Sequence, residues 1–192
     1  MIDYKNPHNY QRSVTKMLEH LVWCTAVAGK SSETITPRFN KMLEKESINN
    51  VIRSHGNRIR GLLREHGIGQ YNRLSRCWSE IGNGSIEGRK CSSGSFLKHA
   101  PREHFTLIHG IGFKTASFFI QSTREHSDVA VLDVHILRWL AEEFPKYPVP
   151  SSTPQDVTEY LRLEAMFIGA SAVLNLTPAE LDLELWLAGS KN

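Results

Sequence analysis

Apolar residues recur at helical spacing along most of the chain, and this pattern predicts where the main helices lie. Over residues 10–28, Val14, Leu18 and Leu21 fall on one face, so we expect the first helix there, ending near Gly29. Two further helices are predicted in the same way, from about Phe113 and directly after Asp133. Their apolar positions are Phe113, Ala116, Phe119 and Ile120 for the first, and Leu132, Ile136, Leu140 and Phe144 for the second.

Shorter helices and loops are predicted for the remainder. A helix from about Glu33 either ends near Pro37 or continues beyond it, and three short helices separated at Gly56 and at residues 67–69 follow before residue 82. Residues 82–95 are rich in glycine and serine and predict an exposed loop, whereas residues 129–132 resemble a short strand. Thr153-Pro154 and Thr177-Pro178 predict helix starts, with threonine as the cap and proline at the first helical position.

The most distinctive stretch covers residues 106–135. Gly110-Ile111-Gly112 is typical of a tight turn, because glycine adopts positive φ angles without steric cost, and Ile111 is expected to pack back into the protein. A turn that leads into a helix presents unpaired N–H groups and the positive end of the helix dipole, which suits a phosphate. Lys114 in the first helical turn and Asp133 before the next helix are the side chains best able to carry chemistry.

Two segments carry a resemblance to a known family. Ile108-His109-Gly110-Ile111-Gly112 with Lys114, and Val131-Leu132-Asp133-Val134-His135, resemble the helix-hairpin-helix DNA glycosylases of the Gly-Pro-Asp type. The chain is most similar to the compact second class of 8-oxoguanine DNA glycosylase/AP lyases. The resemblance implies that the hairpin grips duplex DNA, that Lys114 is the nucleophile, and that Asp133 assists it. One position departs from the pattern, since His109 stands where the family usually has proline.

The resulting fold prediction is an all-α protein with two helical lobes and the helix-hairpin-helix at the cleft between them. A length of 192 residues suits a single DNA glycosylase domain over residues 1–192. One lobe is expected over residues 30–100. The other is expected to combine the N-terminal helix with residues 101–192.

The charge distribution indicates the partner better than the formal net charge of +3 does. Six arginines fall within residues 53–76 against a single acid, whereas the segment from residue 151 onward is mainly acidic. A basic middle segment fits a protein that lays one face on duplex DNA, although a solvated helix face would have the same composition. The expected DNA contacts are His109, Gly110, Ile111, Gly112, Arg89 and Lys90. The loop that carries Arg89 and Lys90 is alternatively a plain linker.

Excision of a base requires that its nucleotide be flipped out of the duplex. In the reaction that the resemblance implies, the unprotonated amine of Lys114 attacks C1′, the base leaves, and a Schiff base forms that permits elimination of the 3′ phosphate. Asp133 is expected to cap its helix and to stabilise the oxocarbenium-like transition state. Alternatively, Asp133 is only a cap, and Lys114 contacts a phosphate in a non-catalytic helix-hairpin-helix DNA-binding module.

The first predicted base-pocket residues lie near the end of the first helix. The resemblance places that helix end beside the extruded base, which makes Trp23, Cys24 and Lys30 candidates. Core packing is the alternative for Trp23, because a tryptophan in an apolar helix usually packs inside the protein.

The last helix supplies the remaining pocket candidates. Asp182 and Trp186 are four residues apart and share one helix face, where they are expected to bond to and stack on an oxidised purine, 8-oxoguanine. The alternatives are a solvent-facing acid and a core tryptophan. Family members also read the oxidised guanine with a lysine at the extreme C-terminus. The ending Gly189-Ser190-Lys191-Asn192 differs from that pattern, which leaves a different modified base open.

Cysteine number and hydropathy bound the cofactors and the location. Three cysteines cannot supply the four-cysteine iron–sulfur cluster of some relatives, and their odd number favours a reducing compartment. By the resemblance, the main-chain carbonyls of Thr106, Ile108 and Ile111 are expected to hold a structural monovalent cation. The chain has no apolar run that could span a membrane and no apolar secretion signal at its N-terminus. We therefore expect a monomeric cytoplasmic protein associated with the nucleoid.

Overall fold

The structure is a computed structural model, and it describes residues 1–189 of the chain. Its elements, in chain order, are α1 (Val14–Val27), α2 (Ser32–Lys45), α3 (Ile48–Arg53), α4 (Gly56–Glu65), α5 (Tyr71–Asn83), β1 (Ser85–Ile86), β2 (Arg89–Lys90), α6 (Gly94–His99), α7 (Arg102–Thr106), α8 (Phe113–Thr123), α9 (Val134–Glu143), α10 (Val157–Val173) and α11 (Pro178–Gly189). Helices therefore dominate the described residues, which confirms the predicted all-α fold class.

Capping residues decide where the first helices begin and end. α1 starts several residues later than predicted, because the Ser13 hydroxyl accepts the N–H of Lys16 at 3.3 Å and caps the helix there. It stops before Gly29, whose φ of +71° is the left-handed conformation that commonly ends a helix. α2 continues through Pro37, so the alternative in which this helix ends at the proline is wrong.

The two predicted threonine-proline helix starts have different outcomes. At α11 the prediction is confirmed, because the Thr177 hydroxyl accepts the N–H of Glu180, while the Glu180 carboxylate accepts the N–H of Thr177. At α10 it is wrong, because the cap is Asp156, which accepts the N–H of Glu159 at 2.9 Å. Thr153 instead donates its hydroxyl to the carbonyl of Leu132 at 2.7 Å.

The two non-helical predictions need correction. Residues 82–95 contain a small antiparallel hairpin, in which β1 pairs with β2. Glu87 and Gly88, with φ of 50° and 74°, form its two-residue turn. Cys91 directly after it is only 2% exposed, so the segment is not simply an exposed loop. Residues 129–132 form no strand; the peptide groups there bond to side chains instead.

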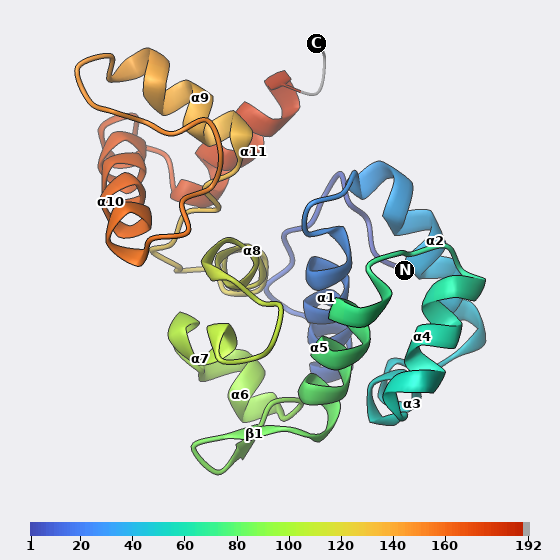
Figure 1. Cartoon of the computed structure of the whole chain (residues 1–192). Coiled ribbons are helices and arrows are strands. Elements are labelled where there is room, and N and C mark those ends of the chain that lie inside the picture. Colours follow the sequence, from blue (N-terminus) through green and yellow to red (C-terminus); the bar gives the residue numbers. More distant parts are fainter. Residues whose placement is uncertain (190–192) are drawn as a thin grey trace.

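The buried apolar residues form two clusters, which we call the large core and the small core. The large core extends from Met17 to Ile120, and the small core extends from Ala130 to Leu181. In Figure 1, α9, α10 and α11 lie together on one side, with α8 between them and the remaining helices. The cores therefore divide the chain between Ile120 and Ala130, rather than near residue 100 as the sequence analysis expected. α1 lies in the large core with both residues 30–100 and α8, because residues 17–26 are buried among α2, α3, α5 and α8.

Candidate active site

The turn between α7 and α8 has the expected hairpin form. Gly110 has a φ of +80°, a left-handed conformation that favours glycine. Ile108 and Ile111 are buried, and the N–H of Ile111 donates to the carbonyl of Ile108 at 3.1 Å. Leu107, in contrast, is 67% exposed. The prediction that Ile111 packs back into the protein is confirmed.

Two side chains of α5 hold this hairpin. Glu80 accepts the backbone N–H of His109 at 2.7 Å. Burial of Glu80 tends to raise its pKa, but this hydrogen bond helps to bring the pKa below its ordinary value. Arg73 donates to the carbonyl of Gly110 at 2.8 Å and to the carbonyl of Thr25 in α1 at 2.7 Å. Arg73 thereby ties the hairpin to α1, a link that the sequence analysis did not predict.

Lys114 and Asp133 line the same cavity, although they come from opposite sides of the division between the cores. Lys114 lies in the first turn of α8. Asp133 is the N-cap of α9, where its Oδ1 accepts the N–H groups of His135 at 2.8 Å and Ile136 at 3.0 Å. The cavity has a volume of about 530 Å³, within the range of small-molecule sites. Asp133 is therefore both a helix cap, as predicted, and part of the cavity wall.

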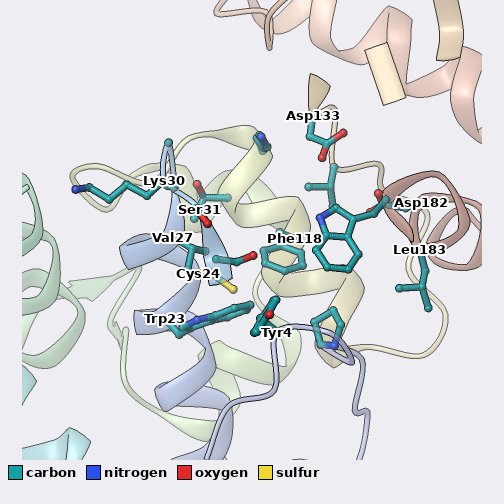
Figure 2. Close-up of a pocket in the computed structure, with 18 of the residues that line it drawn as sticks. Tyr4, Trp23, Cys24, Val27, Lys30, Ser31, Phe118, Asp133, Asp182 and Leu183 are labelled. Atoms are coloured by element: carbon teal, nitrogen blue, oxygen red, sulfur yellow. The ribbon is translucent and has the colours of Figure 1, made fainter. Parts of the chain in front are cut away.

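Every residue predicted for the base pocket lines this cavity. These residues are Trp23, Cys24, Lys30, Asp182 and Trp186. Figure 2 shows Trp23 and Cys24 of α1 on the opposite side from Asp133 and Asp182. Trp23 is also 1% exposed, and its Nε1 donates to the Thr36 hydroxyl at 3.0 Å. Core packing and pocket lining are therefore compatible for Trp23.

Asp182 occupies an environment that favours its neutral form. Withdrawal from bulk water raises its pKa well above the ordinary value, and the nearby Asp133 carboxylate raises it further. Lys114 acts in the opposite direction, but burial and a like charge together outweigh this single cation. Because Asp182 is half-buried and lines the cavity, it faces the cavity, unlike the solvent-facing acid of the alternative interpretation.

The N-terminal segment also lines the cavity, and the sequence analysis missed it. Its lining residues are Tyr4, Pro7 and His8. The Tyr4 ring meets the Trp186 ring edge to face, with the ring centroids 6.5 Å apart. The segment is anchored by reciprocal hydrogen bonds between the backbone of Ile2 and the Asn40 side chain, each 2.9 Å long. No periodic pattern marks these residues, because they form no helix.

Phe118 is a further lining residue that the sequence analysis missed. Its ring lies 5.6 Å from the Trp23 ring, centroid to centroid, at the centre of the view in Figure 2. A signal for it exists in the sequence, because Phe118 follows Lys114 by four positions and so shares its helix face.

Arg89 and Lys90 are not among the residues that line the cavity. They form β2, where Arg89 contacts Glu87 at 3.5 Å and His104 at 3.4 Å, and Lys90 is exposed. Their contact with DNA stays a prediction.

The remaining sequence predictions concern metals, membranes and the C-terminus. Within residues 1–189, no three His, Cys, Asp or Glu side chains gather as a metal site, and no helix is long and apolar enough to cross a membrane. The carbonyls of Thr106, Ile108 and Ile111 lie at the hairpin, where that of Ile108 accepts one hydrogen bond. The predicted difference from the family's C-terminal lysine falls on residues that the structure does not describe, namely Ser190, Lys191 and Asn192.

The fold and the site together define a helix-hairpin-helix protein in which a lysine after the hairpin and a capping aspartate meet at an aromatic-lined cavity between two helical cores. Residues 1–176 match the family model described as 8-oxoguanine DNA glycosylase. Because this match covers most of the chain, the chain belongs to the 8-oxoguanine DNA glycosylase family, as the resemblance in the sequence predicted.

Two curated relatives align with a limited part of the chain. It is 38% identical over 79 residues to the 8-oxoguanine DNA glycosylase/AP lyase of Thermoplasma acidophilum, and 37% identical over 79 residues to that of Methanocaldococcus jannaschii. Each alignment covers 41% of this chain, and it spans 36% of the first relative and 37% of the second. The chain therefore aligns with little more than a third of the length of these relatives.

Solved structures match over nearly the whole chain. The M. jannaschii 8-oxoguanine glycosylase/lyase, in complex with 15mer DNA containing 8-oxoguanine, has a TM-score of 0.70 and 21% identity, and the match covers 95% of this chain and 84% of that one. The 8-oxoguanine DNA glycosylase of Thermotoga maritima has a TM-score of 0.70 and 21% identity, with 92% and 80% covered. At this identity, the likeness shows a shared fold.

Proposed function

We propose that this protein is a bifunctional DNA glycosylase and AP lyase that removes an oxidised purine, 8-oxoguanine, from duplex DNA. The observation that carries the proposal is the meeting of Lys114 and Asp133 at one aromatic-lined cavity. The names of the relatives, which describe this pair of activities, support it. We also propose that the protein acts as a monomer on nucleoid DNA in the cytoplasm.

Lys114 is the nucleophile in the proposed reaction. Its unprotonated amine attacks C1′ of the flipped nucleotide, and the electrons of the glycosidic C–N bond leave with the base, which takes up a proton. The sugar ring then opens as O4′ leaves C1′ and is protonated, which yields a Schiff base between C1′ and Lys114. Loss of a proton from C2′ expels the 3′ phosphate, and hydrolysis releases the lysine.

Asp133 supplies negative charge while the base departs. Positive charge develops on C1′ and O4′ at that stage, and a carboxylate whose orientation is already set stabilises this charge without reorganisation. The two N–H groups that Asp133 accepts set the orientation of its carboxylate. The capping role therefore supports the catalytic role.

The base pocket is assigned to Trp23, Asp182 and Trp186. The indole rings provide flat apolar surfaces for a purine, and the carbonyl oxygen of the Asp182 carboxyl group can accept a purine N–H even when that group is neutral. Oxidation at C8 converts N7 of guanine from an acceptor into an N–H donor. An acceptor placed at N7 would therefore favour 8-oxoguanine over guanine by about 1–3 kcal/mol, the cost of leaving a buried polar group unpaired.

The hairpin is the proposed contact with the DNA backbone. Gly112 precedes α8 and is exposed, and a Cβ atom built there would meet nothing within 4 Å, so a phosphate could approach its backbone. The same turn is the proposed site of a monovalent cation held by the carbonyls of Thr106, Ile108 and Ile111. These neutral oxygen donors fit a hard monovalent cation, and the Ile108 carbonyl retains a second lone pair beside the hydrogen bond from Ile111.

Borohydride trapping tests the function. The protein is incubated with duplexes that each contain one modified base, and borohydride reduces any Schiff base to a stable protein–DNA adduct. We expect an adduct and a strand nick with 8-oxoguanine, and neither with Lys114→Gln. A full-strength adduct in that variant would exclude Lys114 as the nucleophile. Release of a different base alone would change the substrate and leave the mechanism in place, whereas binding without release would indicate a non-catalytic module.

A further inference from the structure

A buried ion pair outside the cavity wall joins the two cores. Arg102 of α7 is 8% exposed and pairs with Glu164 of α10, which is 5% exposed. α7 belongs to the hairpin and the large core, whereas α10 belongs to the small core. No pattern in the sequence marked either residue, and neither lines the cavity.

Glu164 holds the chain segment that leads to Asp133. Its Oε1 accepts the backbone N–H of Ala130 at 2.8 Å. The carbonyl of Ala130 accepts the hydroxyl of Tyr160 at 2.7 Å. Ala130 is therefore held at both its N–H and its carbonyl by side chains of α10, three positions before Asp133.

Arg102 holds the helix that carries Lys114. Its Nη1 donates to the Ser117 hydroxyl in α8 at 3.1 Å, and its guanidinium lies over the ring of Phe113, 4.7 Å from the centroid. Phe113 directly precedes Lys114, and Ser117 lies on the next helical turn. One ion pair thus contacts two segments of the site. Arg102 contacts α8 on either side of Lys114, and Glu164 contacts the segment before Asp133.

Stability alone is a weak explanation for this arrangement. Removing two charges from water costs about as much as their attraction returns, so an apolar pair of similar volume often serves the fold equally well. Unlike an apolar contact, the pair also makes directional hydrogen bonds, which constrain the orientation of Ser117 and Ala130. Direction matters at a reacting centre, where a displacement of about 1 Å can reduce the rate about 100-fold.

We propose that Arg102 and Glu164 are positioning residues that place the amine of Lys114 relative to the carboxylate of Asp133. The proposal rests on the proposed glycosylase function. It assigns the pair no contact with the substrate. Its effect is transmitted by Phe113 and Ser117 on one side and by Ala130 on the other.

The test replaces the pair by apolar residues of similar volume, in the double variant Arg102→Met with Glu164→Leu. We measure the single-turnover rate of 8-oxoguanine release, the Kd for a duplex that contains an uncleavable abasic-site analogue, and the melting temperature. We expect a rate about 100-fold lower than wild type and a Kd unchanged within about threefold, since the hairpin surface is intact. The control is Glu159→Leu with Arg162→Met, an ion pair on the same helix whose side chains are 36% and 35% exposed, and its rate should equal that of the wild type.

Two further variants keep the proposal falsifiable. Glu164→Gln retains an oxygen that accepts the Ala130 N–H, and we expect it to recover most of the rate. If the double variant does not fold, Arg102→Lys decides, because lysine keeps the charge but lacks the planar fork that also reaches Ser117. A wild-type rate in a folded double variant or in Arg102→Lys would overturn the proposal, as would rate and Kd changing in parallel. Absence of base release by the wild-type protein would instead overturn the proposed function, and this proposal with it.

Discussion

Tyr4 and Trp186 lie edge to face in the wall of the cavity, with ring centroids 6.5 Å apart, although they come from opposite ends of the chain. The N-terminal segment is thereby brought against α11, the helix that we propose for base recognition. Figure 2 shows Tyr4 on the side of the cavity away from Lys30.

Replacement Tyr4→Ala should reduce kcat/KM for 8-oxoguanine release. An aromatic pair of this geometry contributes about 0.5–1.5 kcal/mol, which corresponds to roughly a 2- to 12-fold reduction. Tyr4→Phe retains the ring and should keep the wild-type value. Tyr10 is a matched control, since it is exposed and lies outside this cavity, and Tyr10→Ala should have no effect. Equal losses in the Tyr4→Ala and Tyr10→Ala variants would contradict the prediction.

The observed capping role of Asp133 and its proposed catalytic role can be separated with two substitutions. Asp133→Asn keeps a good N-cap but loses the charge, so base release should slow about 100-fold while the melting temperature stays close to that of the wild type. Asp133→Ala also loses the cap and should cost about 1 kcal/mol of unfolding free energy in addition. Single-turnover rates and thermal melts measure the two effects. A normal rate in Asp133→Asn would leave Asp133 with the capping role alone.

The raised pKa of Asp182 predicts how stability depends on pH. The folded protein holds a proton on this carboxyl group at pH values where the unfolded chain has already released it. Folding stability due to this group therefore falls as the pH rises above about 4, the range in which an ordinary aspartate ionises, until the raised pKa is passed. Asp182→Asn removes this dependence, so its stability relative to wild type should increase with pH. Urea unfolding at a series of pH values tests this, and parallel curves for the two proteins would refute it.

Replacement of Arg73 should reduce stability and duplex binding more than replacement of an exposed arginine does. Arg73→Met leaves the carbonyls of Gly110 and Thr25 without their donor, which should lower the unfolding free energy by about 1–3 kcal/mol. The substitution should also weaken duplex binding, because the hairpin loses its connection to α1. Arg58 is a control from the same basic segment, exposed and paired with Glu46, and Arg58→Met should change stability by less than about 1 kcal/mol. Chemical denaturation and a duplex-binding titration measure both quantities. Equal effects of the two substitutions would contradict the role assigned to Arg73.

Local patterns were sufficient for several features of the site. The start of α8 at Phe113 follows from helical spacing, and the turn before it follows from the glycines at 110 and 112. The cap formed by Asp133 follows from residue type and from the apolar face behind it. Asp182 and Trp186 line the same cavity because residues four apart share a helix face. Each of these depends on interactions within a few positions of the chain, which the sequence displays directly.

Features that depend on distant residues were missed or misplaced. The sequence analysis placed the start of α10 at Thr153. The Thr153 hydroxyl instead donates to the carbonyl of Leu132 in another segment. The division between the cores was expected near residue 100, because an apolar helix such as α1 does not specify which neighbours bury it.

By itself, the sequence determined the helical class, the hairpin, and the positions of Lys114 after the hairpin and of Asp133 at the start of the next helix. Only the tertiary structure decided that Tyr4 completes the cavity wall, that Arg73 ties the hairpin to α1, and that Arg102 and Glu164 join the cores. The physical reason is that a buried polar group takes whichever partner the packing of distant segments brings within hydrogen-bonding distance. Helical periodicity and capping act over one or two turns and carry no information about that partner.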